Sequence, residues 1–284
     1  MEEFDVIILG GGAAGLSAAL YSTRAMQKTL VLERLGYGGQ ILVTDMIENY
    51  PGFPEGIRGP DLSKMMEDQT RRFGADMRYE EVESVENLHE PLKLIHTSEG
   101  TYAGKTIIIA CGGSHKKLGV PGEEELSGKG VSYCAVCDGN FFRGEDVVVV
   151  GGGDAALDEG GYLTGIVNKV SVIHRRDQLR ASKILQERSL HNPKMEFLWS
   201  HVVERFQGGT QLDNVLVRNL KTDVVYEYPA SGAFIYIGFE SNTGFLQGQV
   251  PIDEFGHIKT NISMETGIPG VYACGDIRVD SDKQ

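Results

Sequence analysis

Two segments of this chain repeat the same order of a strand, a glycine-rich turn and a helix. In the first, the apolar run Val6–Leu9 leads into GGGAAG at Gly10–Gly15, and an Ala/Leu-rich helical pattern follows. In the second, Asp146–Val150 leads into GGGDAA at Gly151–Ala156, again before a helical pattern. The first glycine of such a turn allows the sharp bend, the second lets a pyrophosphate approach the backbone, and the third small residue lets helix and strand pack closely. One copy is a weak signal, but two copies in the same context predict two dinucleotide-binding units.

The residues that end the next strand of each unit differ. Glu33 ends the apolar run Thr29–Leu32, 18 residues after Gly15, where a carboxylate suits the hydroxyls of an adenosine ribose. The corresponding strand of the second unit, Lys169–Ile173, is followed by a basic cluster of His174, Arg175, Arg176 and Arg180. Arginines accommodate a 2′-phosphate, whereas an acidic residue binds a 2′-hydroxyl. We therefore expect FAD in the first unit and NADPH, rather than NADH, in the second.

The two units predict an α/β protein of two Rossmann-like, three-layer domains, and the length of the chain agrees. A chain of 284 residues suggests two domains. The net charge of −13 argues against general binding to nucleic acid or anionic membranes, which need basic faces. No apolar run approaches the roughly 20 residues of a membrane span, and the acidic start differs from the basic opening of a secretory signal. We expect a cytoplasmic location.

Cys134-Ala-Val-Cys137-Asp138 lies between the two units and has three interpretations. A structural zinc site usually needs a second pair of ligands, and the other cysteines, Cys111 and Cys274, are isolated in the sequence. Two ordinary thiols would leave the spacing unexplained. A redox dithiol is favoured, because closely spaced cysteines can form a small disulfide loop and such motifs commonly lower a cysteine pKa. We predict no metal site.

Over essentially its whole length, the chain resembles the low-molecular-weight, bacterial-type thioredoxin reductases. The matching stretches are GGGAAG (Gly10–Gly15), GGQ (Gly38–Gln40), ENYPG (Glu48–Gly52), YCAVCDG (Tyr133–Gly139), GGGDAA (Gly151–Ala156), HRRDQLRAS (His174–Ser182), IGFESNT (Ile237–Thr243) and GVYACGD (Gly270–Asp276). A CxxCD motif between two nucleotide-binding units is diagnostic of that family and its close relatives.

The resemblance implies roles for particular residues. FAD contacts would be Gly10, Gly12, Ala13, Ala14, Gly15, Glu33, Arg34, Gly39, Gln40, Asn49, Gly112, Gly275 and Asp276, the last of them on the ribityl chain. NADPH contacts would be Gly151, Gly153, Asp154, Ala155, His174, Arg175, Arg176 and Arg180. Cys137 would face the flavin, Cys134 would attack the disulfide of thioredoxin or a thioredoxin-like protein, and Asp138 would serve as the acid and base. The family also implies a homodimer.

The same resemblance implies a split FAD domain, residues 1–114 and 246–284, with the NADPH domain, residues 115–245, inserted and carrying the CxxC motif. Nicotinamide and disulfide both need the flavin, while thioredoxin needs an exposed disulfide. A rotation of one domain relative to the other would satisfy both requirements, with hinges expected at Ser114–Lys117 and Ser241–Gly244.

The sequence departs from the family pattern in two places. It ends at Lys283-Gln284, where the family begins a final helix whose N-terminus points to the flavin, and we expect a truncated sequence. Cys111 and Cys274 stand where the family more often has alanine or threonine. Free cysteine behaves as a small buried hydrophobic residue, so inert core thiols are favoured over an auxiliary redox pair.

Two local features remain to be explained. Gly160-Gly161 fall within the second predicted helix, where each glycine costs about 1 kcal/mol relative to alanine. The acidic run Glu123–Glu125 is expected to be a solvated loop rather than a docking site.

Several related functions stay open beside the leading one. The reductase module of an alkyl hydroperoxide reductase shares this core but usually carries an extra N-terminal domain. Ferredoxin–NADP reductases of this fold lack the CxxC motif, and a ferredoxin-dependent thioredoxin reductase tends to lose the arginine cluster. A flavin-bearing redox sensor without turnover is the alternative from a different functional class.

Overall fold

The computed structural model describes residues 1–281, which form two compact units. The first unit contains Met1–Ser114 and the chain from Glu240 onward, and the second contains His115–Phe239. The chain therefore crosses from the first unit to the second between Ser114 and His115, and crosses back between Phe239 and Glu240. After the second crossing, Asn242 binds the end of the first segment: its backbone N–H donates to the carbonyl of Gly112 at 3.0 Å and its Nδ2 to that of Cys111 at 2.9 Å. The helix start expected at Lys283-Gln284 lies outside the described residues.

The first unit is built on a largely parallel sheet. Its elements are β1 (Glu2–Leu9), α1 (Ala13–Arg24), β2 (Thr29–Glu33), the 3-10 helix η1 (Gly39–Val43), β3 (Met46–Ile47), β4 (Ile57–Arg58), α2 (Gly59–Arg72), β5 (Asp76–Tyr79), β6 (Val82–Glu86), β7 (Lys93–Thr97), β8 (Thr101–Ile109), η3 (Gly244–Leu246), β19 (Val271–Ala273) and η4 (Gly275–Ile277). The sheet order is β5-β2-β1-β8-β7-β6, and β19 also pairs with β8. The two crossing segments, β9 (Gly113–His115) and β18 (Phe239–Ser241), pair with each other.

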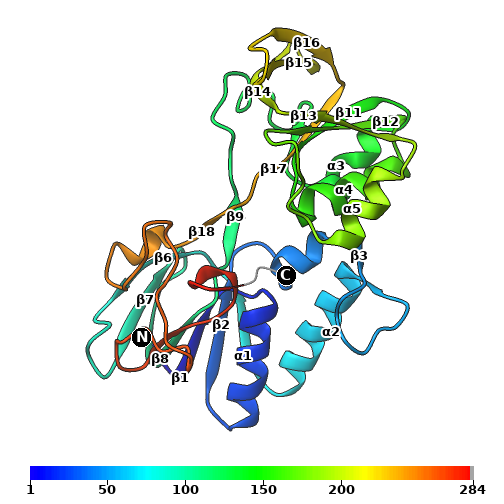
Figure 1. Cartoon of the computed structure of the whole chain (residues 1–284). Helices are drawn as coiled ribbons and strands as arrows, with labels where there is room; N and C mark the ends of the chain where they lie inside the picture. The colour runs from blue at the N-terminus through cyan, green and yellow to red at the C-terminus, as the bar shows by residue number, and fades with distance from the viewer. Residues whose placement is uncertain (282–284) are drawn as a thin grey trace. The chain divides into compact units, whose positions relative to one another are not determined.

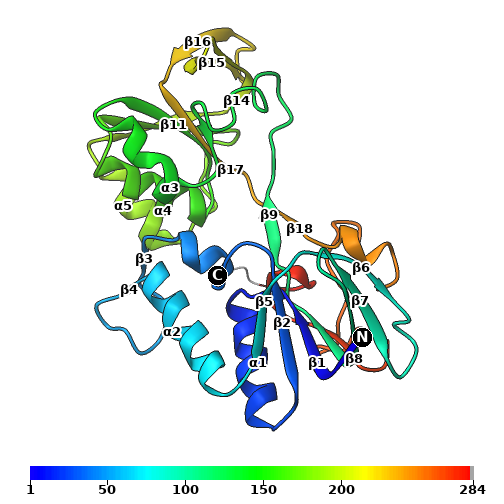
Figure 2. The same ribbon diagram turned by 180° about the vertical axis from the view of Figure 1, so that it is seen from behind.

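Alternate residues of β1 point to opposite faces of this sheet, and both faces are buried. Val6 and Ile8 pack with Leu16 of α1, which runs along the sheet in Figure 2. Ile7 and Leu9 pack on the other face, with apolar residues of β8, β19 and the segment 246–277. A continuous apolar run is typical of a parallel strand that is covered on both sides.

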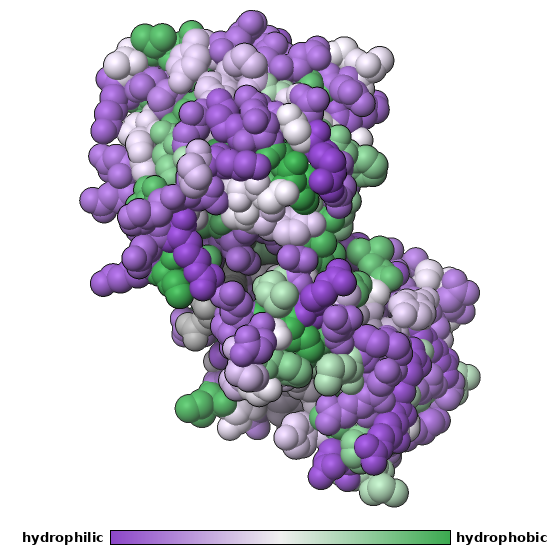
Figure 3. Space-filling model, turned by 90° about the vertical axis from the view of Figure 1, so that its right-hand side faces the viewer, coloured by the Kyte–Doolittle hydropathy of each residue, from purple (hydrophilic) through white to green (hydrophobic). Residues whose placement is uncertain are grey.

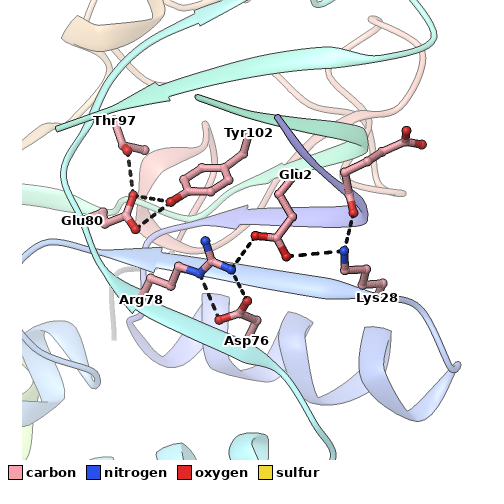
Figure 4. A network of polar contacts seen from close by, with 8 residues as sticks. Glu2, Lys28, Asp76, Arg78, Glu80, Thr97 and Tyr102 are labelled. Atoms are coloured by element: carbon pink, nitrogen blue, oxygen red, sulfur yellow. Dashed lines mark hydrogen bonds and ion pairs between the residues drawn. The ribbon is translucent and has the colours of Figure 1, made fainter. Parts of the chain in front are cut away.

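A polar network links strands that are distant in sequence (Figure 4). Glu80, which is 9% exposed, accepts hydrogen bonds from the hydroxyls of Tyr102 at 2.8 and 2.9 Å and Thr97 at 2.7 Å. Arg78, two residues earlier, donates to Glu2 at the start of β1. A buried carboxylate needs such donors, whereas the more exposed ion pairs contribute only about 0–1 kcal/mol each. The network therefore joins β5 to β1, β7 and β8.

The second unit repeats the parallel core. Its elements are β10 (Val131–Ser132), α3 (Ala135–Asp138), η2 (Gly139–Phe142), β11 (Asp146–Gly151), α4 (Asp154–Thr164), β12 (Lys169–His174), α5 (Lys183–Leu190), β13 (Met195–Trp199), β14 (His201–Gly208), β15 (Leu212–Asn219), β16 (Val225–Pro229) and β17 (Gly232–Tyr236). The parallel sheet has the order β10-β17-β11-β12-β13, and β14-β15-β16 form a separate antiparallel sheet. Figure 1 shows the helices on one side of the parallel sheet and β14–β16 on the other, giving three layers.

The two faces of β11 separate the cores of this unit. Val147 and Val149 pack against α4, where Leu157 and Leu163 are buried. Val148 and Val150 pack against the antiparallel sheet. Gly160 is explained by this packing, because a Cβ there would lie 3.2 Å from Cε of Met195.

The surface matches the composition. On the face drawn in Figure 3, hydrophobic residues occur in small groups among hydrophilic ones. Within the described part of the chain, no helix is long and apolar enough to cross a membrane.

Two glycine substitutions are expected to have opposite effects on stability. A Cβ at Gly161 meets no atom within 4 Å, so Gly161→Ala should raise the free energy of unfolding by about 0.5–1 kcal/mol through helix propensity. A Cβ at Gly15 would lie 1.9 Å from the carbonyl oxygen of Gly10, so Gly15→Ala should lower it by about 3 kcal/mol or more. Urea unfolding of both variants measures the difference, and a destabilised Gly161→Ala would contradict the packing described here.

Candidate functional site

The glycine turn of the first unit brings two backbone segments into contact. Gly10 has a φ of +103°, and a Cβ on it would lie 2.5 Å from the carbonyl oxygen of Ala110, just beyond β8. Helix α1 then begins at Ala13, and the preceding residue, Gly12, provides no side-chain cap. Its first N–H groups therefore have no side-chain acceptor, which is the arrangement that binds phosphate at a helix N-terminus.

Glu33 is held beside this turn by the backbone. Its Oε2 accepts the N–H of Gly11 at 2.8 Å, and its Oε1 accepts the N–H of Leu35 at 2.9 Å. Each carboxylate oxygen has a further lone pair for a hydroxyl. The residues of this unit therefore fit a dinucleotide whose ribose lies at Glu33 and whose pyrophosphate lies at the start of α1.

The structure brings some of the other predicted FAD contacts to this turn. A Cβ on Gly275 would lie 2.7 Å from that of Ala14, so the Gly275-Asp276 pair lies against the start of α1. A Cβ on Gly39 would lie 3.1 Å from Cα of Gly12. Asp276 accepts a hydrogen bond from the hydroxyl of Ser281 at 3.1 Å.

Three other predicted contacts have exposed side chains in this structure. Arg34 is exposed and forms an ion pair with Glu81 at 3.3 Å. Asn49 is exposed in the segment between β3 and β4, and its side chain makes no hydrogen bond within residues 1–281. Gln40 is exposed in η1.

The ring of His174 packs against the second glycine turn. A Cβ on Gly152 would lie 2.4 Å from the His174 ring, which is 6% exposed and contacts the carbonyl of Gln178 through Nε2 at 3.0 Å. Burial lowers the pKa of His174, which favours the neutral ring. His174 therefore supports the turn from inside the unit.

The segment after His174 runs back along the turn. The N–H of Arg180 donates to the carbonyl of Gly152 at 2.7 Å, and the N–H of Ser182 donates to the Asp154 carboxylate at 2.8 Å. Helix α4 begins at Asp154, and the preceding residue, Gly153, provides no side-chain cap. The turn of the second unit therefore also has an uncapped helix N-terminus.

Three guanidinium groups lie in the residues that follow β12. The side chains of Arg175, Arg176 and Arg180 are all exposed, and none forms an ion pair within the described residues. Charged donors without partners beside an uncapped helix N-terminus can bind a second phosphate group.

Cys134 and Cys137 form a disulfide around the short helix α3, with their Cα atoms 5.3 Å apart. Cys137 is exposed and Cys134 is half-buried. The N–H of Cys137 donates to Sγ of Cys134 at 3.1 Å. The disulfide is therefore on the surface of its own unit, with one sulfur held by the backbone of the loop.

Ser132 links the two polar ends of this loop. Its hydroxyl donates to Oδ2 of Asp138 at 2.7 Å and accepts the N–H of Cys134 at 3.1 Å. Ser132 is buried at the end of β10, so the Asp138 carboxylate is fixed by the sheet. Sequence reasoning missed Ser132, although its place two residues before the CxxC motif was a usable signal.

Comparison with known proteins agrees with this geometry. Residues 4–283 match the family model described as pyridine nucleotide-disulphide oxidoreductase. The chain is 45% identical over 282 residues to a thioredoxin reductase of Bacillus subtilis, covering 99% of this chain and 89% of that protein. It is 42% identical over 287 residues to one of Peptoclostridium litorale, covering 99% and 91%. The crystal structure of Lactococcus lactis thioredoxin reductase superposes with a TM-score of 0.96 at 43% identity, covering 99% of this chain and 92% of that one.

The chain belongs to the thioredoxin reductase family. The α/β fold with two dinucleotide-binding domains, predicted from the sequence, is confirmed by this likeness. The Cys134–Cys137 disulfide fits the redox-active disulfide of a thioredoxin reductase. Within the described residues, no group of three or more His, Cys, Asp or Glu residues could hold a metal ion.

The structure corrects the interpretation of the acidic run Glu123–Glu125. Glu124 and Glu125 are exposed, as a solvated loop requires, but Glu123 is only 1% exposed. Its carboxylate accepts the N–H of Leu118 at 2.8 Å, the N–H of Gly119 at 2.6 Å and the hydroxyl of Tyr133 at 2.7 Å. Glu123 therefore links residues 118–119, which follow the first crossing between the units, to Tyr133, which precedes Cys134.

Tyr37 is a second residue that sequence reasoning missed. Its ring is 3% exposed, and a Cβ on Gly11 would lie 2.5 Å from Cδ1 of that ring. Its hydroxyl donates to the carbonyl of Arg78 at 3.1 Å. Tyr37 therefore supports the backbone that donates to Glu33.

Cys111 and Cys274 are free thiols that belong to different cores. Ala273 pairs with Ile109 in the adjacent parallel strands, so the next residues alternate in direction. Cys111 packs with the core that contains Ile109, and Cys274 packs with the core on the opposite face. This arrangement favours two inert thiols over a second redox pair.

Native alkylation should distinguish the two classes of cysteine. Burial raises the pKa of Cys111 to about 12 and that of Cys274 to about 11, so both stay protonated at pH 8. Iodoacetamide at pH 8 should modify Cys134 and Cys137 of the reduced native protein much faster than Cys111 and Cys274, since the thiolate is the nucleophile. The modification of Cys111 and Cys274 should accelerate as the pH approaches 11. Mass spectrometry of peptides measures the rates, with denatured protein as the control, and rapid native labelling of Cys111 at pH 8 would contradict this prediction.

Proposed function

We propose that this chain carries reducing equivalents from NADPH through FAD to the Cys134–Cys137 disulfide, and from there to thioredoxin or a thioredoxin-like protein. The observation that carries the proposal is the presence of a surface disulfide and an uncapped, arginine-flanked glycine turn in the same unit. The other unit supplies a second such turn, with a carboxylate in place of the arginines.

The residues that would hold FAD lie in the first unit. The first N–H groups of α1 would bind its pyrophosphate, the Glu33 carboxylate its adenosine ribose, and Asp276 the ribityl chain. The bound flavin would supply hydride acceptance and two-electron transfer. The chain's own residues bind and orient the cofactor at these positions.

The dithiol would reduce its partner by exchange. The Cys134 thiolate attacks one sulfur of the partner's disulfide, forming a mixed disulfide and releasing the other sulfur as a thiolate. The Cys137 thiolate then attacks Sγ of Cys134, which releases the second partner thiolate and restores the Cys134–Cys137 bond. Two protons complete the partner's thiols, and we assign to Asp138, which Ser132 holds beside the loop, the role of acid and base.

The arginines support NADPH as the electron donor. A ferredoxin-dependent enzyme of this fold would not need three unpaired guanidinium groups beside a nucleotide turn. The same groups argue against a sensor without turnover. The homodimer and the cytoplasmic location expected from the family stay predictions, and sedimentation of the FAD-loaded protein tests the first of them.

Anaerobic stopped-flow absorbance tests the electron path. Mixing the FAD-loaded protein with NADPH should bleach the flavin absorbance, and oxidised thioredoxin should restore it. In Cys134→Ser, bleaching by NADPH should persist and restoration by thioredoxin should be lost, because the attacking thiol is missing. If NADPH leaves the flavin oxidised, the assignment of NADPH as the electron donor is wrong, and a ferredoxin-type donor replaces it.

The coenzyme assignment has its own test. We expect Arg175→Ala and Arg176→Ala each to raise KM for NADPH about tenfold or more, because a hydrogen bond between charged groups contributes about 1.5–3 kcal/mol. KM for NADH should change little, since NADH lacks the 2′-phosphate. Lys129→Ala, at an exposed position of the same unit, is the matched control. Equal effects on both coenzymes would contradict recognition of the 2′-phosphate.

A further inference from the structure

We propose that Tyr236 is a positioning residue of the dithiol, whose hydroxyl holds the amide of Ala135 inside the CxxC loop and thereby favours the disulfide form. The inference rests on the proposed function, because it concerns how the same Cys134–Cys137 pair is set for electron transfer. Nothing in the CxxC motif itself points to Tyr236, which lies about a hundred residues later in the chain and reaches the loop only through the fold.

The backbone of Tyr236 is fixed by the centre of the parallel sheet. It ends β17, which lies between β10 and β11 and is buried along its whole length. Tyr236 pairs with Gly151, and a Cβ on that glycine would lie 2.3 Å from the Tyr236 carbonyl oxygen. The residue therefore cannot shift without disturbing the second nucleotide turn, and a site built on a strand of this kind holds its side chain accurately.

The side chain of Tyr236 reaches the dithiol loop from this strand. Its hydroxyl accepts the N–H of Ala135 at 2.8 Å, and the two residues are 6% and 0% exposed. Ala135 directly follows Cys134 and is the first residue of α3, where a helix gives its N–H no backbone acceptor. A buried N–H without an acceptor is unfavourable, so Tyr236 supplies what the loop lacks.

The hydroxyl stays protonated and its ring is confined. Burial, and after it the charges of Glu159 and Asp138, raise the pKa of Tyr236 well above its ordinary value. The rings of Tyr236 and His115 are in a T-shaped arrangement with centroids 6.0 Å apart. Tyr236 is therefore a fixed neutral hydrogen-bonding group at physiological pH, with no role as an acid or base.

This hydrogen bond should affect the two redox states unequally. Reduction adds two electrons and two protons, breaks the bond between the sulfurs and leaves two thiols. In the disulfide form the loop is closed, so the Ala135 amide has one position and depends on Tyr236. In the dithiol form the loop gains freedom, and the amide can turn to another acceptor. Tyr236 therefore stabilises the disulfide form more than the dithiol form and lowers the midpoint potential of the pair.

The midpoint potential of three full-length, FAD-loaded proteins tests this inference: the wild type, Tyr236→Phe and Tyr226→Phe. Each is equilibrated in dithiothreitol redox buffers, quenched with acid, denatured and alkylated with a maleimide of high mass. Of the 4 cysteines, all are modified when the pair is reduced, and only Cys111 and Cys274 are modified when it is oxidised. Tyr226 is the matched control, because its hydroxyl hydrogen-bonds His201 at 3.0 Å in another part of the unit.

We expect the midpoint of Tyr236→Phe to become less negative, by about 30 mV for each tenfold change in the dithiol–disulfide equilibrium. Tyr226→Phe should match the wild type. A midpoint of Tyr236→Phe equal to that of the wild type would overturn the inference, whatever happens to thermal stability. A merely structural role would lower the unfolding temperature without moving the potential.

A second variant removes the donor instead of the acceptor. Ala135→Pro lacks the N–H at the first position of a helix, where proline is tolerated. In that background Tyr236→Phe should no longer shift the midpoint, because the hydrogen bond is already absent; an undiminished shift would overturn the inference. The redox buffer replaces NADPH in all these measurements. A wild-type pair with no two-electron transition would therefore reject the dithiol function itself, whereas a normal transition with an unshifted Tyr236→Phe rejects only the role of Tyr236.

Discussion

The close approach of a glycine turn to the end of a neighbouring parallel strand is the contact on which both sites depend. At Gly10 the neighbour is the carbonyl of Ala110, and at Gly151 it is the carbonyl of Tyr236. Any side chain at these glycines would push the strands apart. Because the strands stay close, the helix that follows each turn points its N–H groups across the carboxyl edge of the sheet, where parallel α/β proteins bind their ligands. The two units share this geometry, and they differ at the end of the second strand, where the first has Glu33 and the second has His174 followed by two arginines.

The position of the dithiol loop also depends on the contact at Gly151, because the strand that this glycine approaches carries Tyr236. Ser132 at the end of β10 fixes Asp138, and Tyr236 at the end of β17 fixes Ala135. These strands are neighbours in the sheet, and β17 is also the strand against which Gly151 packs. The CxxC loop is thus held by residues on rigid strands, while its own backbone forms only a short helix. Such an arrangement keeps a reactive loop in place without burying Cys137.

The parts of this design that are local in sequence could be predicted from it. The apolar runs, the glycine turns and the CxxC motif each form within a few residues, so spacing along the chain is enough to predict them. Glu123 could not be assigned in this way, because an acidic run looks solvated until the donors of Leu118 and Tyr133 converge on one member of it. The contacts of Tyr236 are equally long-range. The contact of Asn242 with Cys111, more than a hundred positions away, is another that spacing along the chain does not reveal.

The four cysteines show how the fold decides what one side chain can do. Cys111 and Cys274 follow neighbouring strands, yet the alternation of side chains in a sheet sends them to opposite faces. Burial then keeps both thiols protonated, so proximity along the sheet edge does not make them a redox pair. Cys134 and Cys137 lie outside any strand, on a loop whose helical turn brings the two sulfurs together and leaves one exposed. Since a thiol needs both access and a partner on its own side to exchange electrons, only the loop pair meets the two conditions in this fold.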